Sequence, residues 1–426
     1  MTVPKVPAKV LAFFLAVLLP FLSTAFGITG FTAMTGAETA VILTKTGGFM
    51  TGVCHPNPDY ADIRKANIGW IREDIPFPYL KNGELSPWYL YWKQIMQDYV
   101  SEGIRVLGVT PYPHEFLSYG LDIRKDEDVQ SIRDVARFLV NDLKGVVSAF
   151  QVTNEMGVDR FTKPLTMKEA AKFIGVQLQA MYPIRGNTLI GYNLGGPGMW
   201  RLPMKMIRYN AFCDYVGLDL YLGCFENVVK TITAFPSIMR FYHLLTRKPI
   251  LLTEFGYIGY GEHKTAEEKQ AILEKYGVHS EEEAVADIDA FISRLPEQLR
   301  RDIEKSCAGM TNEEKAKVLF KGEYANHIYC ELQKGYGLYG YAHTPEGQAK
   351  FYADLIPRLK TLPFCVGAFI YMWHDSECCY VCGQADCPVE TGWGLIDGQG
   401  NAKPAYYAVQ VAFANAPVIS KRITDF

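Results

Sequence analysis

The chain has 426 residues, of which 49% are hydrophobic and 21% are charged, and its formal net charge at pH 7 is −3. This length and apolar content allow a large buried core, and a single α/β barrel with insertions is compatible with them, because such barrels typically need about 250 residues or more. The small net charge gives no electrostatic reason to expect nucleic acid as a partner.

The N-terminus has the pattern of an export signal. Two lysines precede the uncharged apolar run 10–22, and residues 23–25 (Ser-Thr-Ala) offer a small-residue cleavage site. We therefore expect a signal peptide over residues 1–25, a linker over 26–47 and a secreted protein. Because no charge appears between Lys9 and Glu38, the apolar run is also long enough to remain uncleaved as a membrane anchor of an extracellular domain.

Eight short apolar segments alternate with amphipathic segments between residues 48 and 415. Most are rich in β-branched or aromatic residues, the pattern of buried parallel strands. The predicted strands are Phe49–Cys54, Ile68–Arg72, Arg105–Thr110, Ala149–Thr153, Thr188–Asn193, Tyr215–Leu220, Ile250–Glu254 and Val366–Trp373. This alternation predicts the α/β class and a (β/α)8 TIM barrel, followed by a C-terminal tail over 416–426. No glycine-rich phosphate fingerprint follows the first strand, which argues against a dinucleotide fold.

The alternation is interrupted between the seventh strand and its helix, over residues 261–341. This segment is charged and has helical patterns. An insertion at this place lies on the face of the barrel where the strands end. It is interpreted either as a lid or wall of a substrate cleft, or as a helical subdomain without substrate contact.

The ten cysteines fit an oxidising compartment. Four of them cluster in residues 378–387, and a loop closed by disulfides is preferred there over a structural zinc bound by the same thiolates. Cys54, at the end of the first strand, lies on the same face of the barrel and is a plausible disulfide partner. Cys213 and Cys365 fall at strand starts on the opposite face and are expected to be buried as small hydrophobic residues.

Two glutamates follow the apolar runs of the fourth and seventh predicted strands, Glu155 and Glu254. A TIM barrel places its chemistry at the C-terminal ends of its strands, so the two carboxylates are expected to face each other across the barrel mouth. Paired carboxylates on either side of a bond are the groups that glycoside hydrolysis requires.

The chain from Gly48 to the C-terminal helix resembles clan A of the retaining glycoside hydrolases, the (β/α)8 enzymes that include cellulases, mannanases, galactanases and β-glycosidases. The most specific matches are Asn154-Glu155 after the fourth strand and residues 253–256 (Thr-Glu-Phe-Gly) after the seventh. Supporting matches are Trp70-Ile71-Arg72, Tyr221, Tyr371-Met372-Trp373, residues 394–397 (Gly-Leu-Ile-Asp) and residues 403–406 (Lys-Pro-Ala-Tyr).

The resemblance implies a role for each residue. Glu155 would be the general acid and then the general base, and Glu254 would be the nucleophile of a retaining double displacement at a β-glycosidic bond. Arg72 and Tyr221 would keep the nucleophile ionised, and Asn154 would bind the sugar 2-hydroxyl.

Two further residues would contact the sugar. His114, just beyond the third strand, lies where this clan often has a sugar-contacting histidine, and Trp373 would form the floor of the site. The expected partner is an oligo- or polysaccharide, and this chemistry requires no metal and no organic cofactor.

Two alternatives stay open. One is a transglycosylase on the same site, in which an acceptor sugar replaces water. The other is a non-catalytic carbohydrate-binding envelope protein. The presence of both glutamates together with Asn154 and Arg72 argues against the second, because a binding module has no need of a matched acid and nucleophile.

Overall fold

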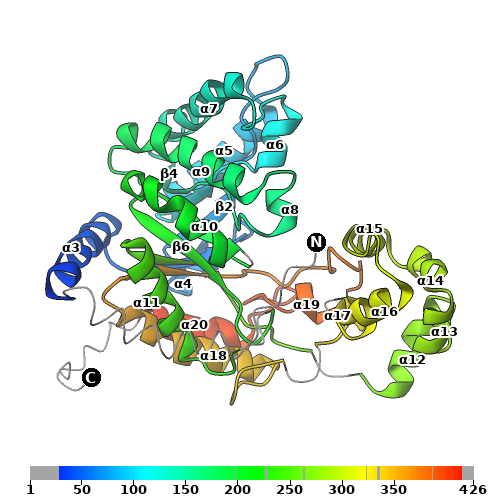
Figure 1. Cartoon of the computed structure of the whole chain (residues 1–426). Helices are drawn as coiled ribbons and strands as arrows, with labels where there is room; N and C mark the ends of the chain where they lie inside the picture. Colours follow the sequence, from blue (N-terminus) through cyan, green and yellow to red (C-terminus); the bar gives the residue numbers. More distant parts are fainter. Residues whose placement is uncertain are drawn as a thin grey trace.

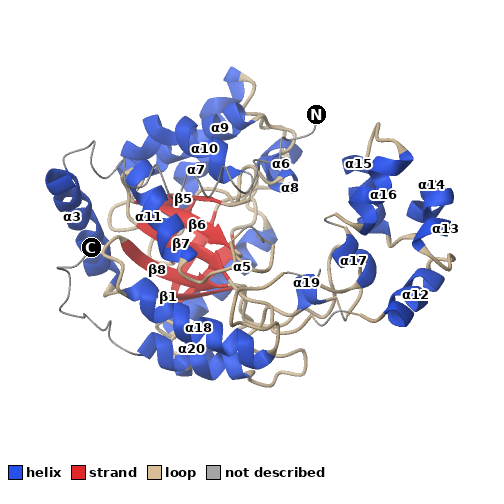
Figure 2. Cartoon of the chain, turned by 60° about the horizontal axis from the view of Figure 1, so that its bottom comes forward, coloured by secondary structure: helices blue, strands red, loops and turns tan. Residues whose placement is uncertain are grey.

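The computed structural model describes residues 28–196, 198–225, 229–261, 264–322, 324–332, 336–385 and 387–414. Eight parallel strands pair in sequence order, and β8 pairs with β1, so the sheet is a closed barrel (Figure 2). The strands are β1 (Met50–Cys54), β2 (Trp70–Asp74), β3 (Arg105–Val109), β4 (Val147–Gln151), β5 (Leu189–Leu194), β6 (Tyr215–Leu220), β7 (Ile250–Phe255) and β8 (Cys365–Ile370). The predicted (β/α)8 fold is confirmed.

Helices surround the barrel and cover the outer faces of its strands (Figures 1 and 2). They pack through one continuous apolar cluster, which explains why the sheet can be apolar on both faces. These helices are α4 (Tyr60–Lys65), α5 (Pro87–Ser101), α7 (Val129–Asp142), α9 (Met167–Met181), α10 (Gly198–Met206), α11 (Ala234–Thr246), α18 (Pro345–Lys360) and α20 (Pro404–Ala414), with 3-10 turns η2 (Asp126–Asp128), η3 (Tyr182–Ile184) and η4 (Ile207–Phe212). The loops that follow β3, β4 and β8 contain the short helices α6 (Pro113–Ser118), α8 (Asp159–Thr162) and α19 (Pro388–Thr391).

The barrel interior is filled by side chains at alternate positions of the strands. On β1, Met50 and Cys54 are fully buried in this interior cluster, together with Phe369 of β8. Gly52 lies between them, and a Cβ atom built there would be 2.2 Å from the Phe369 ring. The glycine therefore makes the space that the aromatic ring occupies.

The amino end of the barrel is closed by a helix that the sequence did not predict. The expected linker 26–47 instead contains α3 (Ile28–Thr46). Ile42 of α3 is 3% exposed and belongs to the interior cluster with Met50 and Trp70. The helix is rich in Gly and Thr, which have low helix propensity, so packing against the barrel rather than local preference accounts for it.

Some predicted segments lie outside the described residues: the signal peptide 1–25, with its alternative as a membrane anchor, and the tail beyond residue 414. Across the ranges that the structure describes, no helix combines the length and the apolar character needed to cross a bilayer.

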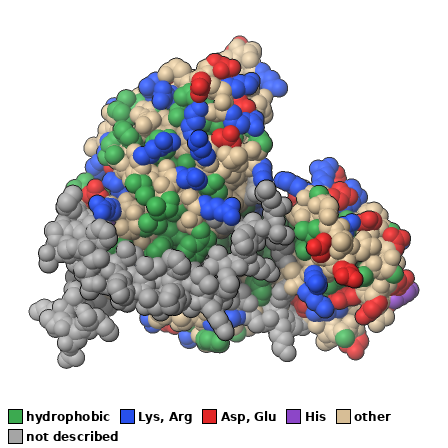
Figure 3. Space-filling model, viewed as in Figure 1, with side chains coloured by type: hydrophobic (Ala, Val, Ile, Leu, Met, Phe, Trp, Pro, Cys, Tyr) green, Lys and Arg blue, Asp and Glu red, His purple; other side chains and the backbone are tan. Residues whose placement is uncertain are grey.

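The insertion between β7 and α18 forms a lobe of short helices beside the barrel (Figure 1). It contains α12 (Ala266–Lys275), α13 (Glu281–Ala286), α14 (Ile288–Arg294), α15 (Glu297–Ser306), α16 (Asn312–Phe320) and α17 (Ala325–Tyr329). Phe291 and Leu299 are fully buried within it, whereas its outer face carries acidic and basic side chains in alternation (Figure 3). Because it leaves from the carboxyl end of β7, it lies on the same side of the barrel as the strand ends.

Gly52→Ala tests the interior packing. The added methyl group must displace the Phe369 ring, so we expect the free energy of unfolding to fall by about 1–3 kcal/mol in urea denaturation. Gly69→Ala is the matched control, since its nearest neighbouring atom would be 3.6 Å away. Equal stability of the two variants would contradict this packing.

Candidate active site

A cavity of about 470 Å³ opens at the carboxyl ends of the strands. All eight strands contribute, either directly or through the loops that follow them. The residues that line its base include Arg72, Asn154, Glu155, Asp219, Tyr221 and Glu254. This volume lies within the usual range of small-molecule sites.

A buried ion pair lies at the base of the cavity. Nη1 of Arg72 is 2.7 Å from Oε1 of Glu254, and the two residues are 1% and 6% exposed. The hydroxyl of Tyr221 donates a hydrogen bond to the other carboxylate oxygen, Oε2. Burial, and then the charge of Glu254, raises the pKa of Tyr221 well above its usual range, so this hydroxyl stays a donor. Both oxygens of Glu254 are thus fixed by a cation and a hydroxyl group.

The same arginine orients the asparagine beside the other glutamate. Arg72 donates from Nε to Gln151 Oε1 at 3.0 Å and from Nη2 to Asn154 Oδ1 at 2.8 Å. Asn154 Oδ1 also accepts from Gln151 Nε2 at 2.9 Å and from Asn193 Nδ2 at 2.6 Å. With its oxygen fully used, Asn154 keeps its Nδ2 group as a donor, and the described part of the chain supplies no acceptor for it.

Glu155 lies in the loop after β4, which ends two residues earlier than the sequence predicts. The backbone of Thr153 and Glu155 is left-handed, with φ of 54° and 40°, and such angles end a strand. The Glu155 N–H donates to Asn193 Oδ1 at 2.9 Å. Its carboxyl group lies over Gly195 at the end of β5, where a Cβ atom would be 2.2 Å from Oε1. Gly195 therefore provides the space for the Glu155 side chain.

A third carboxyl group, Asp219 of β6, lies between the two glutamates in the network. It is 1% exposed, accepts from Asn193 Nδ2 at 2.5 Å, and accepts from Thr253 Oγ1 at 2.6 Å. Burial, and then the charges of Glu254 and Glu155, raises its pKa well above the usual range. Burial beside two other carboxyl groups thus opposes the ionisation of Asp219.

The rim of the cavity is built from loops. Arg160 of α8 donates a hydrogen bond to the Tyr380 hydroxyl, and Glu390 of α19 lies nearby; all three line the cavity. Burial raises the pKa of Glu390 to about 7, although Tyr380 and Arg160 act in the opposite direction. This rim is therefore polar and able to change its charge near neutral pH.

The five predicted residues Arg72, Asn154, Glu155, Tyr221 and Glu254 all line this cavity. Two other predicted residues do not.

His114 is exposed on α6, where its ring stacks on Tyr112 with centroids 5.6 Å apart. Tyr112, rather than His114, lines the cavity, and it donates a hydrogen bond to Asp74 Oδ2 at 2.9 Å.

The prediction that Trp373 faces the cleft is wrong. The side chain is fully buried, and its Nε1 donates to Asp59 Oδ2 at 2.9 Å. Strand β8 ends at Ile370, three residues before the predicted end, and the aromatic residue that lines the cavity is Tyr371.

The cysteines differ from the predicted disulfide loop. None of the ten forms a disulfide in the structure. Cys54 is in the barrel interior, with its Sγ 3.6 Å from the Thr253 carbonyl oxygen, and is not part of the 378–387 cluster. Cys213 and Cys365 are buried, as predicted. Three cysteines of the cluster converge with a histidine, His327, in a group able to bind a metal ion.

Sequence reasoning missed the buried polar residues Gln151, Asn193 and Asp219, and it gave no role to Thr253. A signal was present, because each is a polar side chain at or near the end of an otherwise apolar strand. Polar groups at such positions are buried only if they are hydrogen-bonded, and they therefore mark a network.

No protein-family model and no curated protein matches the chain. Solved structures do share its fold. A family 39 glycoside hydrolase from Bacteroides cellulosilyticus WH2 aligns with a TM-score of 0.51 and 13% identity, over 85% of this chain and 62% of that one. The chain thus spans less than two thirds of that protein.

Two other hydrolases align over more of their own length. The family 53 glycoside hydrolase catalytic domain of Ignisphaera aggregans has a TM-score of 0.51 and 15% identity, over 88% of this chain and 94% of that one. A glucosidase from Croceicoccus marinus has a TM-score of 0.50 and 10% identity, over 85% and 67%. The shared feature is the fold, the closed barrel that the resemblance to clan A predicts.

Arg72→Met tests the buried ion pair. The substitution leaves the Glu254 carboxylate buried without its cation, so the free energy of unfolding should fall by about 3–5 kcal/mol in urea at neutral pH. Arg137→Met breaks an exposed pair with Asp134, 3.0 Å apart, and should cost less than about 1 kcal/mol. Equal losses in the two variants would show that Arg72 is not a structural partner of Glu254.

Proposed function

We propose that this chain is a glycoside hydrolase that cleaves β-glycosidic bonds of an oligo- or polysaccharide. The observation that carries the proposal is the presence of Glu155 and Glu254, from the ends of β4 and β7, in the wall of one cavity. The fold shared with three glycoside-cleaving proteins supports it. Export to the cell exterior is part of the proposal and rests on the charge pattern of residues 1–25.

The proposed mechanism is a retaining double displacement. Glu254 attacks the anomeric carbon and forms a covalent glycosyl-enzyme intermediate, while Glu155 protonates the departing glycosidic oxygen. Glu155 then takes a proton from the water that hydrolyses the intermediate. This mechanism requires the two carboxyl groups to be about 5–5.5 Å apart. The contacts of Glu254 with Arg72 and Tyr221 support its role as nucleophile, because each carboxylate oxygen has a partner and the orientation of the carboxylate is therefore fixed.

The remaining network fits transition-state binding. The Nδ2 group of Asn154 is the donor proposed for the sugar 2-hydroxyl, a hydrogen bond that strengthens as charge develops on the ring. Its orientation depends on Arg72, Gln151 and Asn193, which hold the amide oxygen. The site is thus arranged before the substrate binds.

Substitution of each glutamate distinguishes their roles. On aryl β-glycosides and a polysaccharide panel, Glu254→Ala should lower kcat by at least about 10⁴-fold on every substrate. In kcat/KM, which reports the step that releases the leaving group, Glu155→Ala should lose about 10²–10⁴-fold on polysaccharides, but much less on aryl glycosides with good leaving groups, since these need no protonation. The exposed Glu127→Ala serves as control. Unchanged activity in Glu254→Ala would exclude this mechanism.

Gly195→Ala should affect the acid selectively. The added methyl group occupies the space of the Glu155 carboxyl group, and a displacement of about 1 Å costs about 10²-fold in rate. The loss in kcat/KM, which reports the step that releases the leaving group, should appear with poor leaving groups and nearly vanish with good ones. Gly398→Ala, where a Cβ atom has no neighbour within 4 Å, is the control. An equal loss with both kinds of leaving group would contradict the placement of Glu155.

A further inference from the structure

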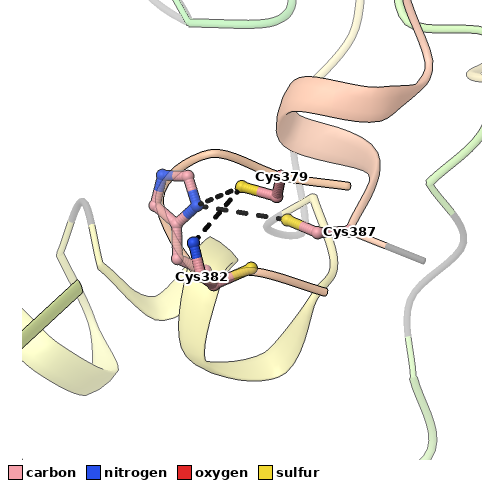
Figure 4. Close-up of side chains that lie close together, drawn as sticks. Cys379, Cys382 and Cys387 are labelled. Atoms are coloured by element: carbon pink, nitrogen blue, oxygen red, sulfur yellow. Dashed lines mark hydrogen bonds between the residues drawn. The ribbon is translucent and has the colours of Figure 1, made fainter. Parts of the chain in front are cut away.

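One cluster of side chains lies outside the proposed catalytic network. One ligand atom from each of His327, Cys379, Cys382 and Cys387 lies within 4.8 Å of all the others. The three cysteines are buried and the histidine is half-buried. Figure 4 shows the three cysteines gathered around one point.

The distances between the ligand atoms suit a metal ion with tetrahedral coordination. The Sγ atoms of Cys379 and Cys387 are 3.7 Å and 4.0 Å from Nδ1 of His327. Two ligand atoms bound to one zinc ion at 2.0–2.3 Å lie about 3.4–3.8 Å apart in a tetrahedral arrangement. The cluster therefore needs to contract only slightly to hold the ion.

The loop is shaped to present thiolates. The Cys382 N–H points at Cys379 Sγ at 3.5 Å, a contact that stabilises negative charge on sulfur (Figure 4). Gly383 has φ of 71°, and its N–H donates to the Cys379 carbonyl oxygen at 2.7 Å, which closes the turn. A left-handed residue directly after the second cysteine permits this tight turn, and glycine adopts it without strain.

A disulfide loop would not explain the histidine. Two cysteines that pair with each other have no use for an imidazole nitrogen directed at their sulfurs, whereas a metal ion requires such a ligand. The group of three thiolates and one imidazole is a donor set typical of structural zinc, and thiolate ligands disfavour calcium and magnesium. Cys330, three residues after His327, interacts with Cys382 and Cys387 at the edge of this group.

We propose that the chain binds a structural zinc ion that joins the helical insertion to the loop after β8; its ligands are His327, Cys379, Cys382 and Cys387. His327 belongs to α17 of the insertion, and the three cysteines precede α19. Two neighbours of the ligands in the chain, Tyr380 and Glu390, line the cavity. The ion therefore fixes the rim of the cavity and the insertion to each other.

Metal analysis of the purified full-length protein tests the proposal. We expect about one zinc per chain by inductively coupled plasma mass spectrometry. Cys382→Ser should reduce this content to below about 0.1, and Cys378→Ser, which changes the exposed neighbour outside the cluster, should leave it unchanged. Absence of zinc from the wild-type protein, or disulfides among these cysteines in peptide mass spectra, would overturn the proposal.

A second measurement uses the wild-type protein, so its result does not depend on whether a variant folds. Removal of zinc with a chelator should lower the Tm. Addition of Co²⁺ should restore the Tm and give thiolate-to-metal charge-transfer absorption and the d–d bands of a tetrahedral site. The chelated protein should also be cleaved faster by protease at the junctions of the insertion near residues 261 and 341. A Co²⁺ spectrum without thiolate bands, or cleavage unaffected by the chelator, would overturn it.

Discussion

The base of the cavity depends on one buried guanidinium group. Arg72 is almost fully buried, and a charge removed from water must be paired and hydrogen-bonded. Its partners are Glu254, Gln151 and Asn154, from β7, from β4 and from the loop after β4. One side chain thus fixes the proposed nucleophile and the residue that precedes the proposed acid. Because a guanidinium has donors in a rigid plane, the positions of these acceptors are coupled.

The barrel explains how such a charge can be kept. Its interior is apolar from α3 at the amino end, through Met50 and Phe369, up to the level of Arg72. Above that level every polar side chain described in the network has a partner, and burial raises the pKa of Asp219. The apolar layer excludes water from below, so electrostatic interactions in the site are stronger than at an exposed surface. Stability of the barrel and precision of the site therefore come from the same packing.

The sequence predicted those parts that depend on local pattern. The eight strands were recognisable because each is a short apolar run, and Glu155 and Glu254 followed from the ends of two of them. The errors arose where a strand ended earlier than its apolar run. At β8, the chain leaves the sheet after Ile370, so Tyr371 reaches the cavity and Trp373 is buried. No local pattern marks that departure, because it depends on contacts with distant segments.

Other features required contacts between residues far apart in the chain. The cysteine loop was visible in the sequence, but the histidine that distinguishes metal binding from disulfides is about fifty positions away in the insertion. The cavity has two kinds of wall. Its base is held by strands, where geometry is rigid, and its rim by the loops that carry Arg160, Tyr380 and Glu390. Rigid strands suit a bond-breaking step that every substrate shares, whereas loops can differ without disturbing the barrel. On the proposed function, the selection among sugars is therefore expected to reside in the rim. The proposed zinc ion, which joins the insertion to the loop after β8, would hold this part of the rim in a fixed position.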